Sequence, residues 1–349
     1  MIINKKKGGG ELTSPLDFEK YVENLSNNEE LFKLLKMLTR AKKSNLEGTN
    51  FTYLGKGKNG VVYKVGENTT IKILEAIDTK CPINNKFVKY CTGYYNEVMI
   101  GILVSNLVKR NECLNFPVLQ RAYIVRNIGV IIRDFSQFVF EDFLQNNLDE
   151  TIINNLILQY FLAVAIIHDK YQSMIFDNKF TNIYVKKYDG KSLIYRVRER
   201  NYEIPCYGYL IIIGDYGSNK FFYPTDQKYF VQMVKYTNVK NLLNDYLKKM
   251  GSMERIRNGN KPKNVWDELH YEKTRQIYFE GLFNPFIEHV YFMSYLIKFA
   301  EENKRHFPII KDYVYLTDYH RNGISLLRKN LSAIELVDKL APKYGVKIY

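Results

Sequence analysis

Cysteine is scarce in this sequence of 349 residues, which contains only four. The four are scattered and form no Cys-x-x-Cys pair, which argues against a zinc site and against a disulfide framework. Reduced thiols are typical of a cytosol-like compartment, so we expect a cytoplasmic protein. The four cysteines are Cys81, Cys91, Cys113 and Cys206.

Long apolar segments are also lacking. The longest runs, at 161–167 and 210–213, are too short to span a bilayer. The first ten residues are basic and glycine-rich, without the apolar stretch of a signal peptide. We therefore expect a soluble protein with no membrane span.

Proline and glycine, at 9 and 20 residues, are too few for a collagen-like or proline-rich chain. Apolar residues make up 46% of the chain and aromatic residues 15%, which excludes a wholly disordered protein. The net charge is +14, and a chain this basic often meets a polyanion. Nucleic acid, an acidic membrane, phosphate groups and acidic protein segments all remain open on charge alone.

The secondary-structure pattern changes along the chain. Residues 1–50 form an extension with a basic tail and helical periodicity over 15–43. Residues 51–143 are rich in strands around one helix, and residues 144–349 are mainly helical. A β-rich part followed by a helical part predicts an α+β bilobal protein. The expected strands are 51–54, 61–65, 69–74, 122–132 and 137–140, and the expected helices are 94–107, 151–168, 231–250, 285–301 and 324–340.

Three glycines lie between the first two predicted strands, in the pattern G-x-G-x-x-G-x-V. Gly55, Gly57 and Gly60 with Val62 form this pattern. A glycine-rich strand–turn–strand lets backbone N–H groups approach a phosphate without Cβ atoms in the way. An ordinary glycine-rich hairpin gives the same pattern, so the motif alone is weak.

Two charged residues follow the glycine motif in the sequence. Lys72 lies on the third predicted strand, and Glu97 lies on the predicted helix 94–107. A lysine–glutamate pair of this kind holds the ammonium group against nucleotide phosphates. A solvated strand lysine and a solvated helix face are the alternatives for each residue taken singly.

Two further motifs complete an ordered set. Residues 177–182 read D-N-K-F-T-N, after a long helix that ends at His168, and residues 215–217 read D-Y-G. With the glycine loop, Lys72 and Glu97, these five motifs occur in the order found in eukaryotic protein kinases. The chain therefore resembles this family over residues 55–217, with tyrosine in place of phenylalanine in D-F-G.

The resemblance implies a bilobal protein-kinase-like fold that binds ATP with Mg²⁺ or Mn²⁺. Asp177 would accept the proton of the acceptor hydroxyl, and Lys179 would support the γ-phosphate. Asn182 and Asp215 would hold the metal. His168 precedes the loop, and we interpret it as a packed structural residue.

The same resemblance implies the place of the adenine. Phe140 would border the adenine pocket, and the hinge that hydrogen-bonds the base would run from Glu141 to Phe143. Lysine two residues after Asp177 is the serine/threonine-kinase pattern rather than the tyrosine-kinase one.

The sequence departs from the family in three places. Ile175 and Phe176 replace the usual His-Arg before the catalytic aspartate, and no A-P-E follows Asp215. Asp215 follows Asp177 by 38 residues (215 − 177), and the interval contains a basic, hairpin-like insert at 186–209. This insert is either a docking site for an acidic partner or nucleic acid, or a solvated hairpin. With these departures the chain resembles the kinases of large nucleocytoplasmic DNA viruses, such as poxvirus virion kinases, which implies action in host cytoplasm or the virion on viral structural proteins.

Four functions are therefore weighed. The leading hypothesis is an active serine/threonine protein kinase, whose protein substrates include acidic segments if the basic charge guides recognition. A pseudokinase scaffold, a small-molecule kinase and a basic nucleic-acid-binding protein are the alternatives. No recognised RNA- or DNA-binding motif supports the last of these.

Overall fold

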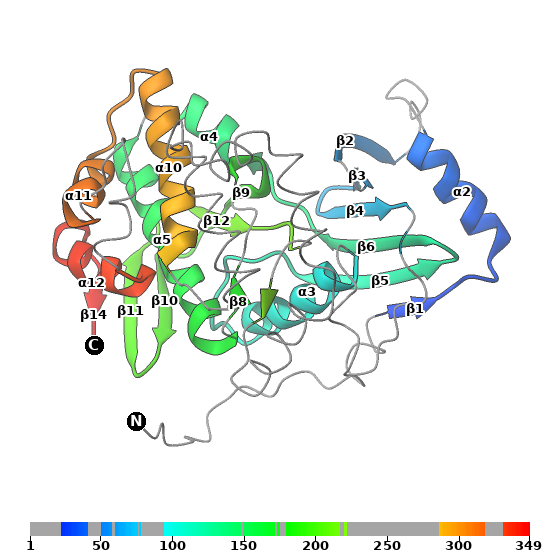
Figure 1. Ribbon diagram of the computed structural model, residues 1–349, viewed down its shortest axis with the longest axis horizontal. Helices are drawn as coiled ribbons and strands as arrows, with labels where there is room; N and C mark the ends of the chain where they lie inside the picture. The colour runs from blue at the N-terminus through cyan, green and yellow to red at the C-terminus, as the bar shows by residue number, and fades with distance from the viewer. Residues whose placement is uncertain are drawn as a thin grey trace, which may run out of the picture. The chain divides into compact units, whose positions relative to one another are not determined.

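The computed structural model describes about three fifths of the chain in two compact units (Figure 1). One unit comprises Met1–Val139, Tyr184–Lys186 and Ile212–Asn219, and the other comprises Phe140–Ile183, Lys187–Ile211 and Lys220–Tyr349. The residues described are 22–40, 50–57, 60–75, 77, 94–147, 149–171, 173–174, 179–216, 220–221, 286–317 and 331–349. The expected helix 231–250 lies outside them.

The first unit is built on a six-stranded sheet of order β1-β5-β6-β4-β3-β2 (Figure 1). All its strand pairs are antiparallel except β1 with β5. The α+β class predicted from the sequence is thereby confirmed. The strands are β1 (Val22–Asn24), β2 (Phe51–Gly57), β3 (Gly60–Val65), β4 (Thr69–Leu74), β5 (Leu119–Val125) and β6 (Ile128–Asp134).

Adjacent strand residues point to opposite faces of this sheet, and among the described residues one helix packs on each face. The face with Leu74 and Ile131 packs against α3 (Tyr94–Lys109). The face with Ile73 and Val130 carries the cluster that includes two leucines of α2 (Glu29–Arg40). Lys72 alternates with Ile73 and therefore belongs to the α3 face.

Helix α3 is fixed to the sheet at both ends. The hydroxyl of Tyr94 donates to the carbonyl of Tyr123 at 2.9 Å, and a Cβ on Gly129 would lie 2.4 Å from the Tyr94 ring. Further along the helix, the Ser105 hydroxyl accepts a hydrogen bond from the Leu119 amide at 2.7 Å. The sheet therefore sets the position of every side chain that α3 presents to it.

Two expectations for this unit are wrong in detail. Within the helical periodicity expected over 15–43, 22–24 instead form strand β1, and Asn28 starts α2 by accepting a hydrogen bond from the Leu31 amide at 2.9 Å. The strand expected over 122–132 is two strands, β5 and β6. Arg126 turns the chain between them with a φ of 56°, a left-handed conformation that few side chains adopt.

The second unit surrounds α5 (Glu150–Tyr171), whose residues from Ile153 to His168 are all buried. Within the described residues, α5 alone is long and apolar enough to cross a membrane, and 89% of its most apolar window is buried. That burial is the pattern of a core helix. The other helices are α4 (Phe140–Asn146), α10 (Phe286–Glu302), α11 (Pro308–Thr317) and α12 (Ala333–Tyr344).

Strands complete the second unit. Residues 192–205 form an antiparallel hairpin, as the hairpin-like insert predicted, and the chain end pairs with it in the order β10-β11-β14. The strand expected over 137–140 is shorter, because Phe140 already begins α4. The remaining elements of the described residues, of which β7 and parts of β9 and β12 belong to the first unit, are β7 (Phe138–Val139), β8 (Ser173–Met174), η2 (Phe180–Asn182), β9 (Ile183–Lys187), β10 (Ser192–Val197), β11 (Arg200–Pro205), β12 (Tyr209–Ile213), β13 (Lys220–Phe221) and β14 (Lys347–Ile348).

His289 belongs to the core of this unit, in agreement with the interpretation of its sequence. Its Nε2 lies 2.6 Å from the Leu331 carbonyl oxygen, and its Nδ1 lies 3.2 Å from the Tyr313 hydroxyl. Burial lowers the pKa of His289 to about 4, so the ring is neutral at pH 7.

We predict opposite effects for alanine at two glycines near α3. Gly129→Ala forces the added methyl group into the buried Tyr94 ring and should lower the free energy of unfolding by about 1 to 3 kcal/mol. Gly101→Ala, inside α3, meets Leu119 only at an ordinary 3.6 Å and should raise it by about 1 kcal/mol. Urea unfolding of both variants measures the difference, and equal effects would contradict this account of how α3 is held.

Candidate functional site

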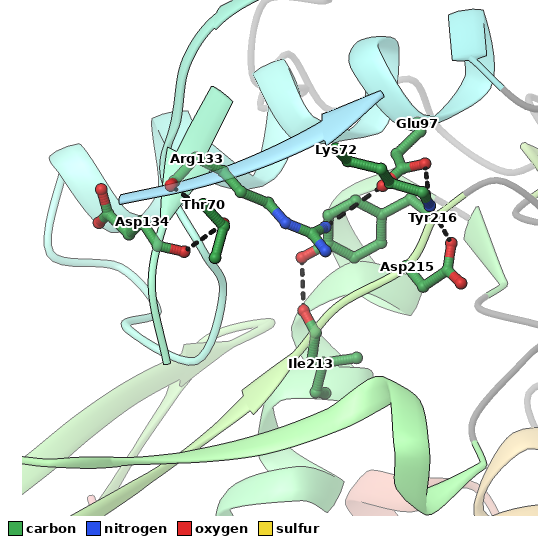
Figure 2. Close-up of polar contacts among 8 residues, drawn as sticks. All are labelled: Thr70, Lys72, Glu97, Arg133, Asp134, Ile213, Asp215 and Tyr216. Carbon is green, nitrogen blue, oxygen red and sulfur yellow. Dashed lines mark hydrogen bonds and ion pairs between the residues drawn. The ribbon is translucent and has the colours of Figure 1, made fainter. Parts of the chain in front are cut away.

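Lys72 lies at the centre of a cluster of charged residues on the α3 face of the first unit's sheet (Figure 2). Its Nζ lies 2.6 Å from Oε2 of Glu97 on α3 and 3.1 Å from Oδ1 of Asp215. Glu97 and Asp215 are 25 and 143 positions from Lys72 in the sequence, respectively. The fold thus brings together three of the residues that the motifs singled out.

Glu97 has a second cationic partner. The NH1 of Arg133, on β6, lies 3.3 Å from the Oε1 of Glu97, so each carboxylate oxygen of Glu97 faces a different cation. The Glu97 side chain is 2% exposed and that of Arg133 is 10% exposed. A carboxylate this deeply buried needs such compensation, because transfer of a charge out of water is costly.

The same neighbours determine the charge of Lys72. Burial alone would lower the pKa of its ammonium group, but the carboxylates of Glu97 and Asp215 outweigh burial and raise the pKa above its ordinary value. Arg133 acts in the opposite sense on this pKa. Lys72 is therefore a fixed cation at neutral pH, which suits it to bind an anion and not to act as a base.

Asp215 occupies a strained position in the chain. Its φ is 59°, in the left-handed region that aspartate tolerates better than most residues. The next residue anchors this segment, because the buried Tyr216 hydroxyl donates to the Ile213 carbonyl at 2.5 Å. Burial raises the pKa of Tyr216 well above its ordinary value, so the hydroxyl remains a donor. Asp215 itself stays 32% exposed and can be reached from solvent.

The glycine motif lies on β2 and β3, beside the strand that carries Lys72. Gly55 and Gly57 are on β2, Gly60 begins β3, and Val62 is the residue of β3 that pairs with Lys72. A Cβ on Gly60 would lie 2.3 Å from the Ile73 carbonyl oxygen, whereas a Cβ on Gly55 would meet nothing within 4 Å. Gly60 is therefore required by the sheet itself, and Gly55 leaves open space.

The remaining predicted site residues belong to the second unit or lie outside the described residues. Asp177 is outside them. Lys179 directly precedes the short helix η2, and Asn182 ends it with 7% exposure. His168 is buried in α5, as expected for a packed residue.

The residues expected on the hinge, 141–143, are all helical. Glu141 and Phe143 lie in α4, and the Phe143 ring packs edge-on against Tyr209 at 4.9 Å between centroids. Phe140, expected beside the adenine, is buried against Phe180 at 5.1 Å.

Sequence reasoning missed Arg133. The signal was present, because Arg133 is two residues after Ile131 and so shares the buried α3 face of an apolar strand. A charged residue at such a position predicts an ion pair within the core.

The described residues include no group of three histidine, cysteine, aspartate or glutamate side chains that would hold a metal ion unaided. The site instead combines a fixed cation, a solvent-accessible carboxylate and a glycine-rich strand pair, a set that suits a phosphate-bearing ligand. No protein-family model and no curated protein sequence match this chain.

We predict that Glu97→Gln strongly destabilises the first unit. The amide would leave Lys72 and Arg133 without the buried negative charge between them, at a cost of about 3 to 5 kcal/mol in the free energy of unfolding. The matched control is Glu75→Gln, which breaks a solvent-exposed pair with Lys36 and should cost under about 1 kcal/mol. Chemical denaturation measures both, and a Glu97→Gln loss as small as that of the control would contradict the assigned role.

Proposed function

We propose that this chain adopts a bilobal protein-kinase-like fold and is an ATP- and Mg²⁺-dependent serine/threonine protein kinase. One observation carries the proposal: Lys72 Nζ contacts both Glu97 and Asp215, at 2.6 and 3.1 Å. The kinase-like motifs predict that Lys72 and Glu97 form a pair, although they are 25 positions apart in sequence, and Asp215, the expected metal ligand, lies beside them. A strand lysine and a helix glutamate that each faced solvent would not be expected to lie in contact.

In this proposal Lys72 binds the α- and β-phosphates of ATP, and Glu97 holds its ammonium group in place. The N–H groups of the Gly55–Gly60 segment approach the phosphates from β2 and β3. Phosphoryl transfer depends mainly on such positioning and charge stabilisation, so a pre-formed cation is suited to it.

The donor set fits Mg²⁺, which prefers oxygen ligands. Asp215 offers a carboxylate and Asn182 an amide oxygen, and neither a thiol nor an imidazole is in the proposed set. Mn²⁺ accepts the same ligands. The metal would supply charge neutralisation at the phosphates. Asp177 would accept the proton of the attacking hydroxyl, and Lys179 would stabilise the γ-phosphate.

The acceptor is a protein serine or threonine in this proposal, on the basis of Lys179 following Asp177 by two residues. The net charge of +14 favours acidic substrate segments. The motif departures support a viral kinase that acts on viral structural proteins in host cytoplasm or in the virion.

A pseudokinase scaffold is the second candidate, and a specific contact favours it. Lys72 already occupies Oδ1 of Asp215 at 3.1 Å, so a metal would have to compete for that carboxylate. Binding of ATP without turnover is the behaviour that separates this candidate from an active kinase.

The deciding experiment is transfer of labelled phosphate from ATP and Mg²⁺ to casein, to a basic protein and to the chain itself. Wild type should label serine or threonine, and Asp215→Asn and Lys72→Met should each lose at least about 100-fold in rate, because metal and phosphate contacts act in the transition state. Lys298→Met, a change at an exposed lysine of α10, is the matched control and should retain full activity. Transfer that survives both site changes would reject the assigned site, and ATP binding without transfer would favour the scaffold.

A second prediction concerns Gly55. Because an added methyl group there meets no protein atom within 4 Å, Gly55→Ala should leave the unfolding midpoint almost unchanged. It should still raise the KM for ATP about tenfold, since the methyl group would stand where the phosphates approach. Gly60→Ala is the contrasting variant and should lower stability first, through its contact with the Ile73 backbone. An unchanged KM in Gly55→Ala would argue against phosphate binding at this strand pair.

A further inference from the structure

Arg133 occupies a position on β6 that directs its side chain toward the candidate site. Its backbone pairs with Thr70 of β4, two residues from the Lys72–Ile131 pair. Because strand side chains alternate, Arg133, Ile131 and Lys72 share the α3 face. Figure 2 shows the guanidinium reaching from β6 to the Glu97 carboxylate, with Lys72 beyond it.

The contacts divide the Glu97 carboxylate between two cations. Arg133 NH1 lies 3.3 Å from Oε1, and Lys72 Nζ lies 2.6 Å from Oε2. The Arg133 side chain is 10% exposed, so the cost of burying its guanidinium must be offset by charges nearby. The carboxylates of Glu97 and Asp215 are charges of this kind, and they raise the pKa of Arg133 against the effect of burial.

A purely space-filling role does not explain this side chain. An apolar residue would fill the same place without desolvation of a charge, but it would remove one partner of a buried ion pair and leave the Glu97 charge less compensated. What an apolar residue would not do is fix the second oxygen of Glu97. With Lys72 as the only partner, the carboxylate could rotate about its terminal torsion, which has broad energy wells.

We propose that Arg133 is a positioning residue of this site, which holds Glu97 by Oε1 and so fixes the orientation in which Oε2 meets Lys72. The catalytic part of this inference rests on the proposed kinase function, because Lys72 is the group that would contact the phosphates. Arg133 acts through Glu97 and sets the geometry of that cation. Arg133, on β6, is thus a third and buried member of the cluster that contains Lys72 and Glu97.

The kinetic test compares Arg133→Met with Arg133→Lys. Methionine is of comparable length and uncharged, so Arg133→Met should lower kcat for transfer from ATP about 10- to 100-fold, with the KM for ATP changed less than about threefold. Arg133→Lys keeps the positive charge and should recover at least about a third of the lost rate. Arg121→Met, at an exposed arginine of the neighbouring strand β5, is the matched control and should leave both constants unchanged. Equal kcat values for wild type and Arg133→Met would overturn the inference.

A second test needs no activity. Urea midpoints are measured for wild type, Arg133→Met, Glu97→Gln and the double variant, with Arg133→Gln in place of methionine if that variant does not fold. If Arg133 acts through Glu97, its replacement should shift the midpoint much less in the Glu97→Gln background than in wild type. Additive shifts would overturn the inference whatever the wild type catalyses. Non-additive shifts together with a wild type that transfers no phosphate would retain the Arg133–Glu97 link and reject the kinase instead.

Discussion

The arrangement of the first unit depends on one buried carboxylate. Glu97 is 2% exposed, and its charge is tolerable only because Lys72 and Arg133 each take one of its oxygens. This requirement joins three elements, since Glu97 is on α3, Lys72 on β4 and Arg133 on β6. Hydrophobic packing alone would permit α3 small shifts along the sheet, whereas a buried ion pair is satisfied in a single position.

Packing and charge agree in this unit. Tyr94 contacts the backbone of β6 at Gly129, and Ser105 receives the amide of Leu119 from β5, so α3 is fixed on either side of Glu97. The sheet's two-residue period then brings Lys72 and Arg133 to the same face as Leu74 and Ile131. The polar cluster therefore lies at the margin of the apolar cluster, and the apolar contacts limit its exposure to water.

Local patterns predicted those parts of the molecule whose structure is set locally. The strands 69–74 and 61–65 and the apolar helix α5 followed from periodicity, and the pairing of Lys72 with Glu97 followed from the order of the motifs, whereas the contact of Lys72 with Asp215 was not predicted. The strand β1 did not, because three residues become a strand only through pairing with β5, about 100 positions later. The turn at Arg126 and the helix start at Phe140 were not predicted, for a related reason. Apolar periodicity continues through both positions, and backbone hydrogen bonding decides where an element ends. The place of Arg133 on an apolar strand, two residues after Ile131, is visible in the sequence, but its partner Glu97 is defined only once α3 packs on the assembled sheet.

The contacts of Lys72 with Glu97 and with Asp215 differ in strength, and this difference determines which contact a ligand can displace. Lys72 is 2.6 Å from Glu97, which is buried, and 3.1 Å from Asp215, which is 32% exposed and held on a left-handed residue. A charge interaction with a solvent-exposed partner is the more strongly screened of the two. In the proposed function, a polyanionic ligand would therefore compete with Asp215 for the ammonium group and leave the Lys72–Glu97 pair in place. The Asp215 carboxylate, once displaced from Lys72, would be available to hold a metal ion, which would supply charge neutralisation at the phosphates. In the proposed function, the exposed contact between Lys72 and Asp215 thus allows the buried Lys72–Glu97 pair to bind and release a ligand.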